Sequence, residues 1–213
     1  MRIVETPVYD LAELSEAAKN KARAWFRDGV DQWEWWDSVY DDFEQIASIL
    51  GVTLAATPVR LMGGGTREKP RVWFSGFSSQ GDGACYEGHY AYAKGAARRI
   101  RDYAPKDKEL HRIADRLQTL QRSNFYQLTA SIRQSGRYYH RFAMTIDVER
   151  GSPSGHPIVD GAEDDLVDAL RDLAHWLYRQ LEREYESQTS DEAVDEGIEA
   201  NEYTFTAEGR RFG

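Results

Sequence analysis

The chain has 213 residues, of which 41% are hydrophobic and 30% charged, a composition that excludes an extended disordered chain. No apolar run approaches the roughly 20 residues that span a bilayer, and the first residues lack the apolar core of a signal peptide. A single cysteine excludes an internal disulfide framework and a zinc site built from several thiolates. We therefore expect a cytoplasmic protein with one domain over residues 1–213.

The formal net charge of −9 is distributed in blocks along the sequence. Residues 94–141 hold 12 basic and 4 acidic residues, whereas residues 160–208 hold 3 basic and 16 acidic residues. Each block is either a solvated helical face or a functional surface, the basic one for an anion and the acidic one as a mimic of nucleic acid. Because the chain as a whole is acidic, we expect no direct binding of nucleic acid.

The first part of the sequence alternates between helical and strand patterns. Apolar residues recur at the helical period in residues 10–28 and 32–50, which predicts two helices. A strand is expected over residues 52–61. Residues 71–77 and 84–92 then read as a hairpin with a long glycine-bearing connection.

The second part adds a short basic helix at residues 94–103. It also adds helices with an apolar stripe or a recognisable N-cap at residues 107–122, 162–187 and 189–200. Residues 125–133 and 138–149 form the clearest hairpin, and residues 203–205 add a small edge strand. Elements with one apolar face pack as two layers. We therefore expect an α+β fold with a mostly antiparallel sheet of four to five strands, helices packed on one face, and an acidic C-terminal helical segment over residues 160–208.

The strongest local signal is the loop Gly81-Asp82-Gly83. Glycines on both sides of Asp82 allow positive φ and let backbone amides approach an anion. In the alternative reading, the loop is a plain tight turn whose Asp82 caps its own backbone. The surrounding sequence contains neither a Walker loop nor a dinucleotide-binding fingerprint.

Arginines and aromatic rings elsewhere in the sequence would complete a receptor for a nucleotide-like ligand, because guanidinium groups bind phosphate and flat rings stack on bases. The predicted ligand-binding residues are Gly81, Asp82, Gly83, Trp73, Tyr86, Arg98, Arg99, Arg137 and Arg141. Ordinary surface salt bridges are the alternative, and Arg98 with Asp102 has the spacing for one. We expect no resident metal, no cofactor and no catalytic residue.

The run FSGFSSQGDGACYEG at residues 74–88 resembles a family of phage and prophage accessory proteins, as do residues 35–43, 104–114 and 189–193. Some members of that family carry the label of antitoxin from a toxin–antitoxin system. The resemblance covers nearly the whole chain. It implies a protein of the bacterial host cell that counters a host defence by binding.

Three functions follow as hypotheses. The first is a non-enzymatic phage-type protein that sequesters a nucleotide-derived signal. The second is an inhibitor of a protein partner, anti-CRISPR-like or antitoxin-like, that uses its acidic helices as a nucleic-acid mimic. The third is a nucleotide-processing enzyme that uses Asp82, Glu87 and His89. The expected partners are accordingly a nucleotide-like small molecule or a host defence protein, with no membrane, and the formation of a homo-oligomer stays open.

Overall fold

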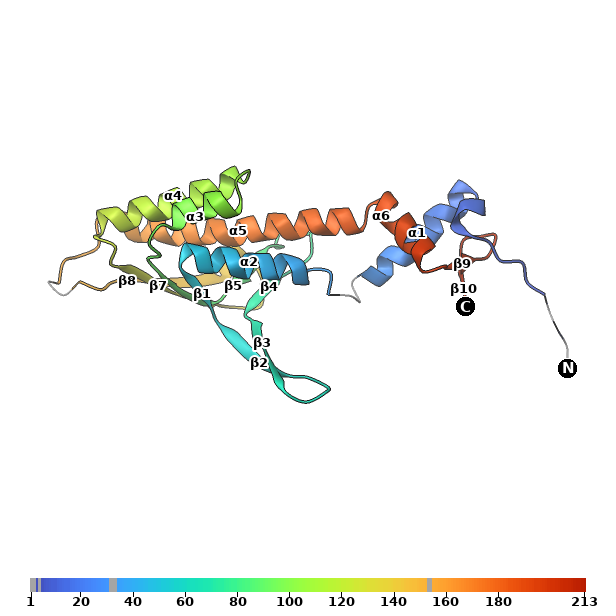
Figure 1. Ribbon diagram of the computed structural model, residues 1–213, viewed down its shortest axis with the longest axis horizontal. Coiled ribbons are helices and arrows are strands. Elements are labelled where there is room, and N and C mark those ends of the chain that lie inside the picture. Colours follow the sequence, from blue (N-terminus) through green and yellow to red (C-terminus); the bar gives the residue numbers. More distant parts are fainter. Residues whose placement is uncertain (1–2, 4, 31–33, 153–154) are drawn as a thin grey trace. The chain divides into compact units, whose positions relative to one another are not determined.

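The computed structural model describes residues 3, 5–30, 34–152 and 155–213 (Figure 1). The chain divides into two compact units. The terminal unit comprises Met1–Ser38 and Leu181–Gly213, and the central unit comprises Val39–Gln180. The sequence predicted a single domain over residues 1–213. The division into two units does not test this expectation, which stays a prediction.

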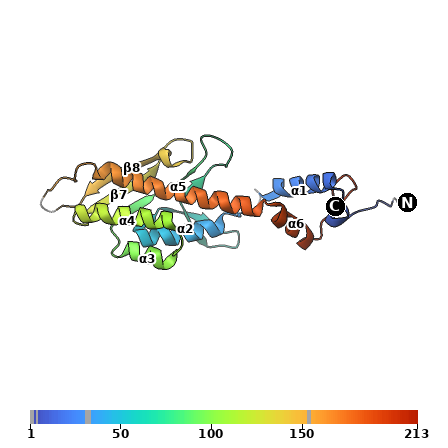
Figure 2. The ribbon, with the colours of Figure 1, turned by 90° about the horizontal axis from the view of Figure 1, so that it is seen from above.

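The central unit is built on a four-stranded antiparallel sheet, which confirms the predicted α+β class. Its strands are ordered β1 (Val52–Leu54), β6 (Gly88–Ala91), β7 (Leu128–Gln134) and β8 (Met144–Arg150). The helices on one face of the sheet are α2 (Asp37–Leu50), α3 (Ala96–Tyr103), α4 (Lys108–Ser123) and the first part of α5 (Ala162–Gln188) (Figures 1 and 2).

The core of the central unit lies between this sheet and its helices, as the alternation along β7 shows. Leu128 and Ile132 are buried, whereas Ser131 and Arg133 are exposed, because successive strand residues point to opposite faces. From the helical layer, α5 buries the stripe Leu166, Leu170, Leu173 and Leu177. The sheet therefore has one apolar face and one polar face.

Two further hairpins extend the central unit. The predicted strand over residues 52–61 is interrupted at Ala55, whose N–H donates to the Glu87 carbonyl at 2.8 Å. The second half becomes β2 (Ala56–Arg60), which pairs with β3 (Thr66–Pro70), a strand that the sequence analysis missed. In the other hairpin, β4 (Val72–Phe74) pairs with β5 (Ala84–Tyr86). The glycine-bearing loop connects these two strands, as the sequence predicted.

The terminal unit packs two helices around a small aromatic core. Its elements are the 3₁₀ turn η1 (Leu11–Glu13), α1 (Glu16–Val30), α6 (Asp191–Ala200), β9 (Thr204–Phe205) and β10 (Arg211–Phe212). Phe26, Val194, Ile198 and Phe205 are buried together, and Arg23 on α1 binds Asp195 on α6 at 2.6 Å. Ser190, rather than a predicted N-cap at residue 189, caps α6.

Two helices near the N-terminus differ from their predicted bounds. The predicted helix over residues 32–50 begins at Asp37 in the structure, and residues 32 and 33 lie outside the described residues. The predicted helix over residues 10–28 is divided into η1 and α1. Across the described ranges, the structure contains no helix that is both long enough and apolar enough to cross a bilayer.

Candidate functional site

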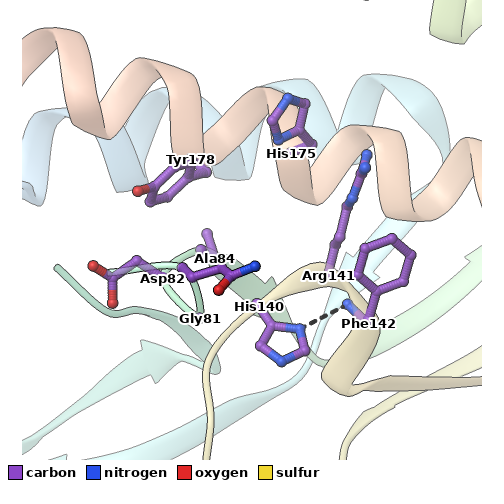
Figure 3. Close-up of a pocket in the computed structure, with 10 residues that line it drawn as sticks. Gly81, Asp82, Ala84, His140, Arg141, Phe142, His175 and Tyr178 are labelled. Carbon is purple, nitrogen blue, oxygen red and sulfur yellow. Dashed lines mark hydrogen bonds between the residues drawn. The ribbon is translucent and has the colours of Figure 1, made fainter. Parts of the chain in front are cut away.

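Two loops of the central unit and one face of α5 line an open pocket of about 280 Å³ (Figure 3). The glycine loop (residues 75–83) joins β4 to β5, and the arginine loop (residues 135–143) joins β7 to β8. The pocket is lined by Gln80, Gly81, Asp82, Gly83, Ala84, His140, Arg141, Phe142, His175 and Tyr178. Residues far apart in the sequence thus meet at one place.

The glycine loop is closed by its own aspartate. The Asp82 carboxylate accepts hydrogen bonds from the N–H groups of Ser78, at 2.9 Å, and Ser79, at 2.6 Å. The Asp82 N–H donates back to the Ser79 carbonyl at 3.0 Å. These backbone amides therefore bind the carboxylate of their own loop. This arrangement is the tight turn that the sequence offered as the alternative.

Gly83 is required for space, and neither Gly81 nor Gly83 is required for positive φ. Neither Gly81 nor Gly83 adopts the left-handed conformation that we expected. Gly83 is buried, and a Cβ there would lie 2.7 Å from the Cβ and 2.9 Å from the Cα of His140. A side chain at Gly83 would therefore separate the two loops, whereas one at Gly81 meets nothing within 4 Å.

The arginine loop differs from the extended strand predicted over residues 138–149. The chain turns in the short 3₁₀ helix η2 (Arg141–Ala143), because the His140 Nδ1 atom accepts a hydrogen bond from the Phe142 N–H at 3.1 Å. Strand β8 consequently begins only at Met144. The turn directs Arg141 toward α5, and the His140 ring is turned to the other side (Figure 3).

Guanidinium groups gather beside the exposed ring of Phe142. The ring centroid lies 4.8 Å from the Arg141 guanidinium carbon and 5.7 Å from that of Arg171, a residue of α5. The Nε atom of Arg171 is buried and has no hydrogen-bond partner among the described residues. Arg141 contacts Asp172 at 3.6 Å, beyond hydrogen-bond length, so its donors are not saturated by this carboxylate.

His175 of α5 is partly buried and has charged groups of both signs around it. Burial and the nearby cations Arg141 and Arg179 lower the pKa of the His175 imidazole, and the carboxylates Asp172 and Glu109 only partly oppose them. The His175 ring is therefore held neutral near pH 7.

Four predicted site residues lie at the pocket: Gly81, Asp82, Gly83 and Arg141. Two others lie on the same side of the fold but outside its lining. Trp73 stacks on Tyr139, with ring centroids 5.9 Å apart and ring planes within 10°. Arg137 lies over the ring of Tyr138, with 5.1 Å between the guanidinium carbon and the ring centroid.

The three remaining predicted residues do not belong to the pocket. Tyr86 is fully buried, and its hydroxyl donates to the Leu170 carbonyl at 3.0 Å, so its ring has no free face for a ligand. Arg98 and Arg99 lie on α3. Arg98 pairs loosely with Asp102 at 3.8 Å, and Arg99 donates to the Ile49 carbonyl at 3.1 Å. Tyr86 is thus a core residue, and the α3 arginines make local contacts.

The alternative catalytic set of Asp82, Glu87 and His89 is not brought together. Glu87 binds Arg71 at 2.8 Å and accepts a hydrogen bond from the Gln134 N–H at 3.1 Å. His89 lies on β6 at the exposed face of the sheet. Within the part of the chain that the structure describes, His, Cys, Asp and Glu form no group of three that could hold a metal ion.

The contribution of α5 to the site was not predicted from the sequence. Its leucine stripe identifies the buried face of the helix, and Arg171, His175 and Tyr178 lie off that stripe. The i, i+4 spacing of Arg171 and His175 and the i, i+3 spacing of His175 and Tyr178 would have placed them along one side of the helix. Nothing in the sequence indicates which loops that side faces.

Some charges of the two blocks pair with each other in the central unit. Arg112 and Arg116 of the basic block contact Asp172, at 2.8 and 3.6 Å, and Arg116 also binds Asp165 at 2.7 Å. Ion pairs thus join helix α4 to helix α5. These pairs reduce the free acidic surface available on α5 and leave Arg141 as a less engaged guanidinium.

No curated protein and no solved structure matches the chain. Residues 35–191 match the model of one protein family, whose description is a domain of unknown function (DUF8835). The matched segment is more than half of the chain, and it contains both loops and the part of α5 that line the pocket. The chain therefore belongs to the DUF8835 family.

Proposed function

We propose that the central unit binds a phosphate-bearing, nucleotide-like ligand in this pocket and does not transform it. One observation carries the proposal: a close-packed glycine loop, an incompletely paired guanidinium and an exposed aromatic ring line the same cavity. These are the groups that bind phosphate and a base, and a pocket of this kind is where a small ligand is expected.

Each component has capacity left for a ligand. The Arg141 guanidinium can donate a two-pronged pair of hydrogen bonds to phosphate oxygens. The Gly81 N–H makes no hydrogen bond to another described residue, and a ligand can approach it closely because no side chain intervenes. Phe142 is 65% exposed, so much of its ring is open to a flat partner.

The biological role that we propose is sequestration of a nucleotide-derived signal of a host defence system. The support is the sequence resemblance to phage and prophage accessory proteins together with a pocket lined by Arg141 and the exposed ring of Phe142. A protein that only withdraws a signal needs a pocket and no acid–base or metal machinery. Asp82 supplies none here, because its carboxylate is held by the backbone of its own loop.

Calorimetry of the full chain against cyclic nucleotides and ADP-ribose-type nucleotides tests the proposal. We expect Arg141→Ala to weaken binding of the nucleotide that binds by roughly 10- to 100-fold, since hydrogen bonds to charged groups contribute about 1.5–3 kcal/mol. Arg98→Ala is the matched control, because it removes the same charge from an exposed position on α3 and should leave binding unchanged. No binding across the panel, or equal loss in both variants, would contradict the proposal.

The two other hypotheses have less support. An inhibitor that mimics nucleic acid needs unpaired acidic helices, whereas Asp165 and Asp172 on α5 are paired with arginines of α4. An enzyme based on Asp82, Glu87 and His89 needs them at one place, and of the three only Asp82 lines the pocket.

A further inference from the structure

The arginine loop contains the same side-chain arrangement twice. The Arg137 guanidinium lies over the Tyr138 ring, and four residues later the Arg141 guanidinium lies over the Phe142 ring, with centroid distances of 5.1 and 4.8 Å. Tyr138 is 57% exposed and Phe142 is 65% exposed. Two large rings of one short loop are therefore left mostly in solvent, where their faces are available to stack on a flat ligand.

The middle of the loop is fixed, whereas Tyr138 and Phe142 on either side of it are exposed. Tyr139 stacks on Trp73, and the Tyr139 carbonyl accepts a hydrogen bond from the Ser75 hydroxyl at 3.3 Å. His140 packs directly on Gly83. The loop is therefore held in place before a ligand arrives, which lowers the entropy cost of binding.

The two pairs are close enough to contact one molecule. Four residues of chain span at most about 14 Å, even when fully extended. Each pair offers a ring face for a base and a guanidinium for a phosphate. A mononucleotide could occupy the pair beside the pocket, and the Arg137–Tyr138 pair would then remain unused.

We propose that this site takes two nucleotides joined through phosphate, one held by Arg141 and Phe142 and the other by Arg137 and Tyr138. The inference rests on the proposed function and specifies its ligand class. A linear dinucleotide, a cyclic dinucleotide and a longer single strand share this chemistry. The net charge of −9 opposes a long polyanion, so we expect the two short forms to bind best.

The test compares adenosine monophosphate, a linear diadenylate, a cyclic diadenylate and an eight-nucleotide oligoadenylate as ligands of the full chain. We expect a dinucleotide to bind at least about tenfold more tightly than the mononucleotide, since stacking on an aromatic ring strengthens binding substantially for each base. Tyr138→Ala should abolish this preference and leave the mononucleotide affinity unchanged. Tyr138→Phe, which retains the ring, should keep the preference.

Phe125→Ala is the matched control. Phe125 is 71% exposed, and its ring lies 5.4 Å from the Arg150 guanidinium carbon, but this pair lies at the other end of β7 and β8. Equal affinities for mono- and dinucleotide with no effect of Tyr138→Ala would overturn the inference and leave the proposed function standing. Binding of the oligoadenylate alone would overturn the preference for short ligands. The absence of all nucleotide binding would overturn both proposals.

Discussion

Substitution of Gly83 by alanine tests the close contact on which the pocket depends. The added Cβ would lie 2.7 Å from the His140 Cβ and 2.9 Å from its Cα, whereas carbon atoms in contact normally lie about 3.5–4.0 Å apart. A change of rotamer cannot relieve a clash with Cα, so the arginine loop must shift by roughly 1 Å. Overpacking of this kind typically costs about 1–3 kcal/mol of unfolding free energy.

The neighbouring glycine provides the control. Gly81 lies in the same loop, its added Cβ would meet nothing within 4 Å, and its φ lies outside the left-handed region. We expect Gly81→Ala to change the unfolding free energy little or to raise it by up to about 1 kcal/mol, because alanine restricts the unfolded chain.

Urea unfolding of the full chain, followed by intrinsic fluorescence and far-ultraviolet circular dichroism, measures both variants. The same preparations are then titrated with the nucleotide that the wild-type chain binds, and Gly83→Ala should lose affinity because Arg141 moves with its loop. If Gly83→Ala were as stable as Gly81→Ala and bound equally well, the two loops would not be in the contact that we describe.

Three further predictions concern buried groups of the central unit. Tyr86→Phe removes the hydrogen bond to Leu170, so it should lower the unfolding free energy in urea by about 1 kcal/mol and leave ligand affinity unchanged. A loss of affinity without a loss of stability would show that Tyr86 belongs to the site. Gln121 is fully buried and bonds both the N–H and the carbonyl of Leu128, so Gln121→Ala should cost at least about 2 kcal/mol by the same measurement, more than Tyr86→Phe. Burial raises the pKa of the Cys85 thiol to about 12, so alkylation at pH 8 should be slow until urea unfolds the chain. Because the unfolded thiol ionises near pH 9 and the folded thiol near pH 12, this group's contribution to stability should fall between those values; rapid alkylation of the native chain would contradict the reasoning.

Much of the fold could be predicted from local patterns, because apolar residues recur at a fixed period along the buried face of an amphipathic helix or strand. The apolar stripe over residues 162–187 corresponds to α5, and the predicted helix over residues 107–122 corresponds to α4. The alternation that predicted β8 continued too far upstream, to residue 138. There a side-chain cap from His140 competes with the strand and forms η2.

The site could be predicted only in part. The glycine loop stood out by composition, and Arg141 was among the candidates. Tyr86 was assigned to the ligand because an aromatic ring in a strand can face either side, and only the packing of β5 against α5 shows that it is buried. His175 and Tyr178 were missed because they join the loops from a segment distant in the sequence. Phe142 was missed because an extended strand, and not the turn η2, was expected there.

The amino-acid sequence by itself determined the α+β class, most of the helices and the unusual glycine loop, since these depend on local periodicity and local turn chemistry. Only the tertiary structure decided which charged side chains pair with each other. Arg112 and Arg116 meet the acidic face of α5, and Arg141 reaches the pocket. The physical reason is that electrostatic partners are chosen by distance in space, which chain packing sets and sequence separation does not reveal.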